Sequence, residues 1–286
     1  MFIFNLIRWI PSKQVMAAFA VIGLASQGFI ATATEAKTHE GDSEGEAKIL
    51  FEDPMTGQEQ DWQENWFLDG EEATLTSTPH GLYFSSGTER GNDAHHAVLW
   101  TKQEFSGDIR IRFDVIGLDR RGYVNILYIH AQGIGEPPYV EDIYEWRDLR
   151  AVPTMSKYFT YMNALHISYN VGRPDRVGYI RARRYPRQPE KGISFGDTSI
   201  KPDYDDEGAK ILPGKVFTIE VEKRGTKLIY RTLDGETKEV LKECVWDTTK
   251  NPENQTPRIV NEGRIGLRQM FTKRNIYRNF KVMRLD

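Results

Sequence analysis

The amino-acid sequence predicts an all-β protein, a sandwich of two antiparallel sheets. From Leu82 onward, apolar residues recur mainly at every second position, which is the period of a half-buried strand. No segment shows a convincing helical period, and turn signals rich in Gly and Asp separate the apolar runs. Many strands joined by short turns are typical of a sandwich or a barrel.

The clearest strand covers residues 109–115, where apolar side chains at odd positions face one side and polar side chains at even positions face the other. Similar runs predict further strands at 95–102, 123–132, 163–170, 178–184, 215–223, 227–232, 264–270 and 276–285. Arg224-Gly225 and Asp234-Gly235 predict tight turns between neighbouring strands.

Two long connections, 133–162 and 185–214, interrupt this series of strands. Loops of that length are usually functional or disordered. The first is rich in Tyr and Trp, which argues against a purely solvated linker. We therefore expect it to form a wall or a lid over one sheet face.

The N-terminal residues predict an export signal. Arg8 and Lys13 supply positive charge, and residues 15–30 are mostly apolar. The small residues around Ala33 predict cleavage after that position. The alternative is an uncleaved anchor, because this stretch is at the short limit for spanning a bilayer.

These features divide the chain into a signal peptide (1–33), a flexible acidic leader (34–48) and one β-sandwich domain (49–286). We expect a periplasmic or secreted protein with no membrane association after signal removal. Cys244 is the only cysteine, so an intrachain disulfide is impossible and the fold must depend on a hydrophobic core.

Composition excludes several functional classes. The net charge of -3 provides no basic field for nucleic acid, so we expect no nucleic-acid partner. The sequence has no Gly-rich phosphate loop and no Cys/His zinc spacing. Gly-x-Ser-x-Gly occurs at 41–45 and 192–196, but neither string directly follows a predicted strand, as a nucleophile elbow requires. We therefore expect no cofactor and no dedicated metal site.

Two blocks of sequence carry a family resemblance. Residues 163–169 (NALHISY), together with 263–270 (GRIGLRQM) followed by 276–280 (IYRNF), resemble the domain-of-unknown-function family 1961 (YesU-like) of the concanavalin A-like lectin/glucanase superfamily. Weaker agreement at 51–62 and 93–100 extends the similarity over nearly the whole mature chain.

The resemblance implies a concanavalin A-like jelly roll, encoded among bacterial genes for the breakdown of acidic polysaccharides. The chain departs from the family pattern in a longer insertion between Tyr169 and Lys215, and in the Tyr-rich approach to Asn163. The identity of the substrate therefore cannot be carried over.

His166 is the first candidate catalytic residue. It shares a strand face with Ala164 and Ser168, and it projects into an open groove if the opposite, aliphatic face is core. A histidine can transfer a proton near neutral pH, although it can equally be structural.

Tyr169, near Arg173, is the second candidate catalytic residue. It could act as base or acid in a β-elimination if a nearby cation lowers its pKa; the alternative is a core aromatic.

Arg268 is the third candidate and shares a face with Arg264 and Gly266. A guanidinium binds a carboxylate bidentately, and neutralising a uronate makes the adjacent C5 proton removable. We expect Arg268 to hold the uronate while His166 or Tyr169 moves the proton. A surface ion pair is the alternative.

Further candidates for substrate binding are histidines, aromatic residues that can stack on sugar rings, and arginines. His95 and His96 point to opposite faces, so at most one, His96, belongs to a site. His130 is either a buried histidine or the polar end of a groove wall. The predicted substrate-binding set is His96, His130, Tyr144, Trp146, Arg173 and Arg264.

Hydrolysis would need a pair of carboxylic groups. Glu220 and Glu222 have suitable spacing but match any solvated strand face. The acids of the first long connection (Glu141, Asp142, Glu145 and Asp148) could act in catalysis or hold a structural Ca²⁺. The sequence thus favours a lyase that degrades a uronate-containing polysaccharide in an open groove; the alternatives are a non-catalytic carbohydrate-binding module and a glycoside hydrolase.

Overall fold

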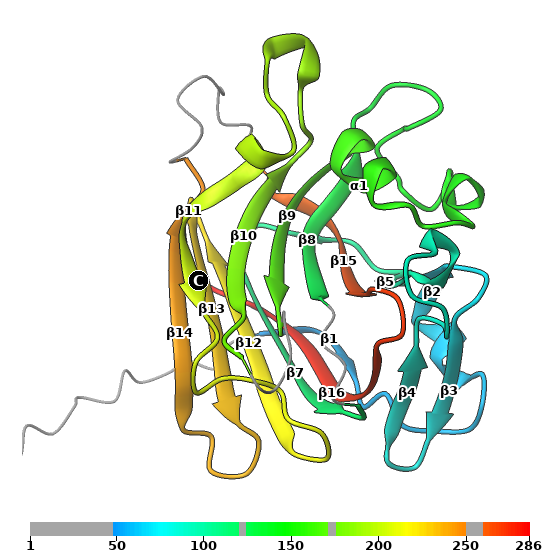
Figure 1. Ribbon diagram of the computed structural model, residues 1–286, viewed down its shortest axis with the longest axis vertical. Coiled ribbons are helices and arrows are strands. Elements are labelled where there is room, and N and C mark those ends of the chain that lie inside the picture. The colour runs from blue at the N-terminus through cyan, green and yellow to red at the C-terminus, as the bar shows by residue number, and fades with distance from the viewer. Residues whose placement is uncertain (1–47, 120–123, 171–175, 250–259) are drawn as a thin grey trace, which may run out of the picture. The chain divides into compact units, whose positions relative to one another are not determined.

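The computed structural model describes residues 48–119, 124–170, 176–249 and 260–286. In these residues the chain forms two sheets of eight strands, and the strands pair antiparallel (Figure 1). The predicted all-β sandwich is therefore confirmed. The predicted signal peptide, all of the predicted leader except Lys48, and Arg173 lie outside the described residues.

The first sheet has the order β14-β13-β12-β7-β16-β4-β3, and β1 also pairs with β16. Its strands are β1 (Ile49–Asp53), β3 (Thr74–Thr78), β4 (Gly81–Ser85), β7 (Ile109–Gly117), β12 (Val216–Arg224), β13 (Lys227–Asp234), β14 (Val240–Asp247) and β16 (Arg274–Arg284).

The second sheet has the order β11-β10-β9-β8-β15-β5-β2, and β6 also pairs with β15. Its strands are β2 (Trp66–Asp69), β5 (Ala97–Thr101), β6 (Phe105–Ser106), β8 (Asn125–Gly133), β9 (Met162–Tyr169), β10 (Tyr179–Tyr185), β11 (Ser199–Asp205) and β15 (Glu262–Gln269).

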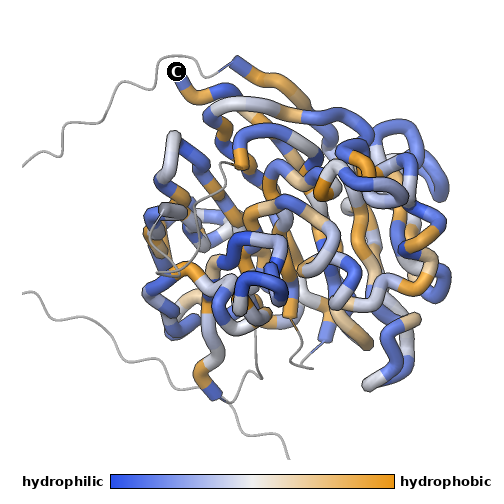
Figure 2. Tube along the Cα trace, turned by 90° about the horizontal axis from the view of Figure 1, so that it is seen from above, coloured by the Kyte–Doolittle hydropathy of each residue, from blue (hydrophilic) through white to orange (hydrophobic). Residues whose placement is uncertain are grey.

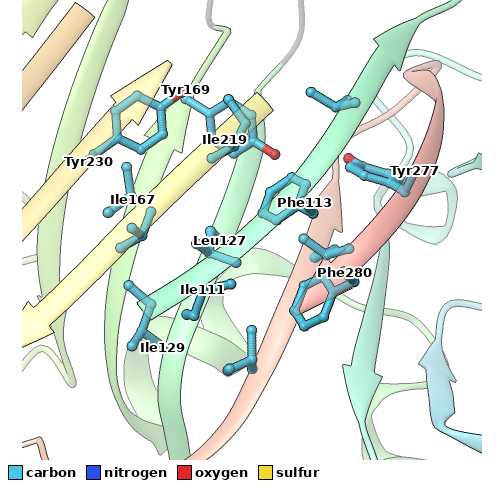
Figure 3. Close-up of a cluster of buried hydrophobic side chains, with 14 of the residues drawn as sticks. Ile111, Phe113, Leu127, Ile129, Ile167, Tyr169, Ile219, Tyr230, Tyr277 and Phe280 are labelled. Atoms are coloured by element: carbon cyan, nitrogen blue, oxygen red, sulfur yellow. The ribbon is translucent and has the colours of Figure 1, made fainter. Parts of the chain in front are cut away.

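The core lies between the two sheets and consists of inward-facing side chains from both. Ile111 and Phe113 of β7 face Leu127 and Ile129 of β8, as the close-up in Figure 3 shows. Figure 2 shows hydrophobic and hydrophilic segments alternating along the chain. This arrangement follows from the period-two pattern, which gives each strand one apolar face to bury.

Each predicted strand overlaps an observed one. β11 was missed because it lies in the presumed loop 185–214, and β1, β2, β3, β4, β6 and β14 were not predicted either. β11 is an edge strand that pairs only with β10 and carries Pro202. Edge strands tolerate proline and exposed polar residues, so their sequences show little alternation.

The expectation of no helix is wrong at one short segment. The connection between β8 and β9, residues 134–161, contains the 3-10 turn η3 (Arg147–Arg150) and the helix α1 (Met155–Tyr161). Such a short helix depends on packing more than on periodicity. Short 3-10 turns also occur as η1 (Asp61–Glu64), η2 (Asp93–His95), η4 (Pro189–Lys191) and η5 (Gly196–Thr198). Within the described residues, no helix has the length and apolar character to cross a membrane.

We call residues 134–161 the lid segment. It packs on the outer face of the second sheet, and its buried side chains join those of β5, β8 and β9 in a second hydrophobic cluster. Figure 1 shows α1 beside β8, with the rest of the segment extending toward β2. The long aromatic connection therefore forms the expected lid.

Candidate functional site

The outer face of the second sheet carries two cross-strand rows of side chains. Both rows run through β2, β5, β15, β8, β9 and β10 in spatial order. The first row is Phe67, Trp100, Gly266, Tyr128, His166 and Arg183. The second row is Asp69, Val98, Arg268, Ile126, Ser168 and Arg181. The register thus places His166 and Arg268 on one face, as their alternation predicted.

The open groove expected on this face is not present. His166 is 1 % exposed and Arg268 is 0 % exposed. The physical reason is the lid segment, whose Ile143, Trp146 and Tyr158 are buried against the sheet. A segment rich in aromatic residues gains free energy by covering an apolar face, so the groove is filled in this conformation.

Trp100 and Tyr128 form what we call the aromatic platform. Their ring centroids lie 5.2 Å apart with an interplanar angle of 23°. Gly266 lies between them in the row and makes this contact possible, because a Cβ there would lie 2.5 Å from the Trp100 ring. Tyr158 of the lid segment lies parallel to both rings, at an angle of 13° to each.

Asp69, at the end of β2, binds the lid segment to the sheet. Its Oδ2 accepts hydrogen bonds from Trp100 Nε1 at 2.7 Å, Arg150 Nε at 2.6 Å and Tyr158 Oη at 2.9 Å. Asp69 and Arg150 are both fully buried at the side chain. Arg150 also donates to the carbonyl of Ile143 at 2.8 Å, so the ion pair fixes the lid backbone.

Arg268 is the buried cation at the centre of the second row. Its Nη2 donates to Pro153 O at 2.7 Å and to His96 Nδ1 at 3.0 Å, and its Cζ lies 4.4 Å from the centre of the Tyr158 ring. Nε and Nη1 are buried without a hydrogen-bond partner. No carboxylate of the described residues lies within ion-pair distance of this guanidinium. A buried charge without a counter-charge is costly, so this feature calls for an explanation.

Two neutral histidines flank the arginine. Burial lowers the pKa of His96 to about 3, and the positive charge of Arg268 acts in the same direction. Because Arg268 donates to Nδ1, the His96 proton is on Nε2, which is buried without a partner. Burial also lowers the pKa of His166 well below its usual value, with Arg183 and Arg268 adding to the effect.

The tyrosine beside His166 is Tyr185 of β10 and not Tyr169. Tyr185 Oη lies 2.7 Å from His166 Nδ1, and Ser168 Oγ lies 2.6 Å from His166 Nε2. Tyr169 points into the core between the sheets, next to Tyr230 (Figure 3). Burial raises the pKa of Tyr169 well above its usual value, the opposite of what a catalytic base needs. The catalytic role expected for Tyr169 does not fit this position, and the alternative, a core aromatic, is confirmed.

His130 also lies away from the site. It is fully buried at an irregularity in the pairing of β8, with a positive φ of 52°. The irregularity interrupts the alternation that aligned His130 with Tyr128, so the groove-wall placement is wrong. Burial lowers the pKa of His130 to about 3, and the positive charge of Lys223 contributes.

Arg264 anchors the lid segment and does not face an open site. Its Nη2 lies 2.9 Å from Asp142 Oδ1 and 3.3 Å from Glu104 Oε1. Arg264 also donates to the carbonyls of Thr101 and Lys102. Its guanidinium is thus already occupied by carboxylates and carbonyls, in contrast to that of Arg268.

The two candidate stacking residues of the lid segment differ in exposure. Tyr144 is 36 % exposed and packs edge-on against Phe67, with centroids 5.1 Å apart. Trp146 is buried, and its Nε1 donates to Val140 O at 3.0 Å. Of this pair only Tyr144 presents a ring to solvent.

The lid acids do not form a metal site in the structure. Asp142 is engaged with Arg264, while Glu141, Glu145 and Asp148 are exposed. Among the described residues, no group of three or more His, Cys, Asp and Glu is positioned to hold a metal ion.

Sequence reasoning did not select Asp69, Arg150, Tyr158 or Tyr185 for the site. The sequence did indicate the place of Tyr185, because alternation in the predicted strand 178–184 puts Arg181, Arg183 and position 185 on one face. The sequence offered no such indication for Asp69, because β2 was not predicted. It offered none for Arg150 and Tyr158 either, because side chains of a connecting segment have no fixed periodicity.

Comparisons with known proteins support the fold. No protein-family model matches the sequence, and no characterised protein matches it at a significant level. A Bacillus subtilis protein of unknown function with a galectin-like fold is 20 % identical, with a TM-score of 0.62 over 83 % of this chain and 96 % of that one. The chain therefore has a lectin-like, concanavalin A-like fold.

Two sugar-binding structures are more distant. The carbohydrate-binding module CBM66 of Bacillus subtilis gives a TM-score of 0.43 at 11 % identity, over 80 % of this chain and 98 % of that one. The exoplasmic/lumenal domain of VIP36 with Ca²⁺ and Man3GlcNAc bound gives 0.48 at 11 % identity, over 82 % and 91 %.

Proposed function

We propose that the protein is a non-catalytic carbohydrate-binding protein that binds an acidic, uronate-containing glycan on the outer face of the second sheet. The observation that carries this proposal is Arg268, whose buried guanidinium has two nitrogen atoms without partners and no carboxylate nearby. A uronate carboxylate would supply the missing counter-charge and could bind the guanidinium bidentately.

The neighbours of Arg268 suit a sugar ring. The aromatic platform of Trp100 and Tyr128 lies in the adjacent row and offers flat apolar surface to the C–H edges of a pyranose. Neutral His96 has a free Nε2–H to donate to a hydroxyl or a carboxylate. Together these groups provide charge recognition, stacking and hydrogen bonding, as small-ligand sites usually do.

The cellular setting belongs to the same proposal. We infer an exported protein, periplasmic or secreted, from the predicted signal at 1–33, and membership of the YesU-like family from the two sequence blocks. Both inferences are consistent with a glycan ligand, because an exported protein encounters the polysaccharides that lie outside the cytoplasm. N-terminal sequencing of the exported protein should begin at Thr34.

Calorimetric titration of the full protein with polygalacturonate, alginate and neutral dextran tests the ligand class. We expect binding to one or both uronate polymers, no binding to dextran, and a loss of roughly tenfold or more in affinity for Arg268→Met. Arg231→Met, on the other sheet, is the matched control and should bind as the unmodified protein does. Equal binding of dextran, or full binding by Arg268→Met, would contradict the proposal.

A second candidate, β-elimination, is favoured by one contact, the 2.7 Å separation of Tyr185 Oη from Nδ1 of His166, which lies in the row beside that of Arg268. In that reaction a base removes the C5 proton of the uronate, a C4–C5 double bond forms, and the C4–O bond breaks with its electron pair going to the leaving oxygen, which takes up a proton from an acid. Ultraviolet absorbance of the new double bond separates the two candidates. Binding without new absorbance supports the binding protein, whereas absorbance that is lost in His166→Ala and Tyr185→Phe supports the lyase.

A further inference from the structure

Tyr158 of the lid segment occupies the surface that a sugar ring would need. Its ring is parallel to both rings of the aromatic platform, with centroids 5.7 Å from Tyr128 and 6.5 Å from Trp100. The Arg268 guanidinium lies over the same ring, 4.4 Å from its centre. A pyranose bound between the platform and Arg268 would overlap this side chain.

We infer that the lid segment is autoinhibitory: in the closed conformation Tyr158 takes the place of the ligand, and glycan binding must displace it. This inference rests on the proposed function and concerns the regulation of that same site. The closed lid occupies two features that the ligand would use, because Pro153 O accepts from Arg268 and the Tyr158 ring covers the aromatic platform. Closure and binding are therefore mutually exclusive.

Three hydrogen-bonded contacts join residues 143–158 of the closed lid to Asp69 and Arg268 of the sheet. Arg150 pairs with Asp69 at 2.6 Å, Tyr158 donates its hydroxyl proton to the same Asp69 oxygen, and Pro153 O accepts from Arg268 at 2.7 Å. A ligand carboxylate is a stronger acceptor for Arg268 than a peptide carbonyl, because it is charged. The ligand can therefore replace the contact with Pro153, and the other two contacts would break as Tyr158 leaves.

The two ends of the lid segment are fixed independently of these contacts. The rings of Tyr139 and Tyr161 stack at 3.7 Å, and Ile134 N donates to Tyr161 O at 3.2 Å. Beyond this stem, Asp142 is held by Arg264. An opening movement would therefore be confined to residues 143–158, which carry all three closing contacts. An equilibrium between closed and open lid lowers the apparent affinity for the ligand, because only the fraction of molecules with an open lid can bind.

The test compares variants of Tyr158 with polygalacturonate as the titrant. Tyr158→Ala removes the blocking ring and should bind roughly tenfold tighter or more. Tyr158→Phe keeps the ring but loses the bond to Asp69, so its affinity should lie between that of the unmodified protein and that of Tyr158→Ala. Leu149→Ala removes an exposed apolar side chain of the lid segment outside the platform and serves as the matched control, with unchanged affinity expected.

Hydrogen exchange of residues 143–158 is the second readout. It should increase in Tyr158→Ala, and in the unmodified protein when polygalacturonate is added. If Tyr158→Ala fails to fold, Tyr158→Phe carries the comparison. Affinities that are equal to or weaker than that of the unmodified protein would overturn the lid inference and leave the proposed function standing, whereas absence of binding by every form would overturn both.

Discussion

The outer faces of the two sheets differ in how Arg231 and Arg268 are paired. On the first sheet, Arg231 Nη1 lies 3.0 Å from Glu220 and 2.9 Å from Glu222, and Arg110 also pairs with Glu222. On the second sheet, Arg268 has no carboxylate partner in the described part of the chain. Charges that are fully paired need no ligand, whereas an unpaired buried charge indicates a site that is incomplete.

The two sheets also differ in how deeply their charged groups are buried and in the pKa values of their histidines. The ion pairs of the first sheet are partly open to water, with Arg231 22 % exposed. The second sheet holds His96, next to β5, together with His130 and His166, and burial lowers the pKa of each. The comparison therefore predicts that the two faces respond differently to pH and to substitution.

The largest expected effect is acid destabilisation through the second sheet. The pKa of His96 is about 3 in the folded protein and 6.5 when unperturbed, so the unfolded chain takes up the proton first as the pH falls. The contribution of His96 to the free energy of unfolding is complete above pH 6.5 and is lost as the pH falls from 6.5 to 3. The loss is up to about 1.4 kcal/mol per pH unit for each such histidine.

Urea denaturation at several pH values measures this slope. His96→Gln should reduce it, while His80→Asn, a change at an exposed histidine, should leave it unaltered. A pH-independent free energy of unfolding across this range would contradict the assignment of buried neutral histidines.

The next effect is the loss of Asp69. Asp69→Ala leaves Arg150 buried without a partner and removes the acceptor of Trp100 and Tyr158. Breaking a buried ion pair from one side costs about 3–5 kcal/mol. Asp203→Ala breaks the half-exposed pair with Arg181 and should cost less than about 1 kcal/mol. Equal costs for the two variants would mean that the Asp69 cluster does not hold the lid segment.

A smaller effect is expected on the first sheet. Arg231→Met leaves Glu220 and Glu222 as neighbouring, largely buried carboxylates without their shared cation. Because water reaches part of this face, we expect a loss of about 2 kcal/mol, less than for the buried pair. Thermal unfolding measures it, and an unchanged Tm would show that these pairs do not stabilise the face.

The smallest effect is expected at Arg268 itself. Arg268→Met replaces an uncompensated buried cation by an apolar side chain of similar length. The free energy of unfolding should change by less than about 1 kcal/mol or should increase, since removing the charge also removes its desolvation penalty. A loss above about 3 kcal/mol would indicate a structural arginine, and the unpaired state would then need another explanation.

The sequence allowed nine strands of the described residues to be predicted, because alternation is a local property that tertiary packing preserves. His166 and Arg268 were placed on one face from alternation alone. The closure of that face was not predictable, because it depends on contacts such as Arg150 with Asp69, which are 81 residues apart. His130 was misplaced because the pairing of β8 is irregular there. Alternation puts Tyr169 on the same face as Leu165 and Ile167, which is the core, so its expected catalytic role did not follow from the pattern.

The central claim is that Arg268 awaits a ligand carboxylate. A crystal structure of the protein with a galacturonate oligosaccharide tests it most directly. We expect a carboxylate oxygen within about 3 Å of the Arg268 guanidinium, a pyranose ring on Trp100 and Tyr128, and Tyr158 displaced from the aromatic platform. An oligosaccharide bound elsewhere, with Arg268 still covered and Tyr158 in place, would contradict the claim.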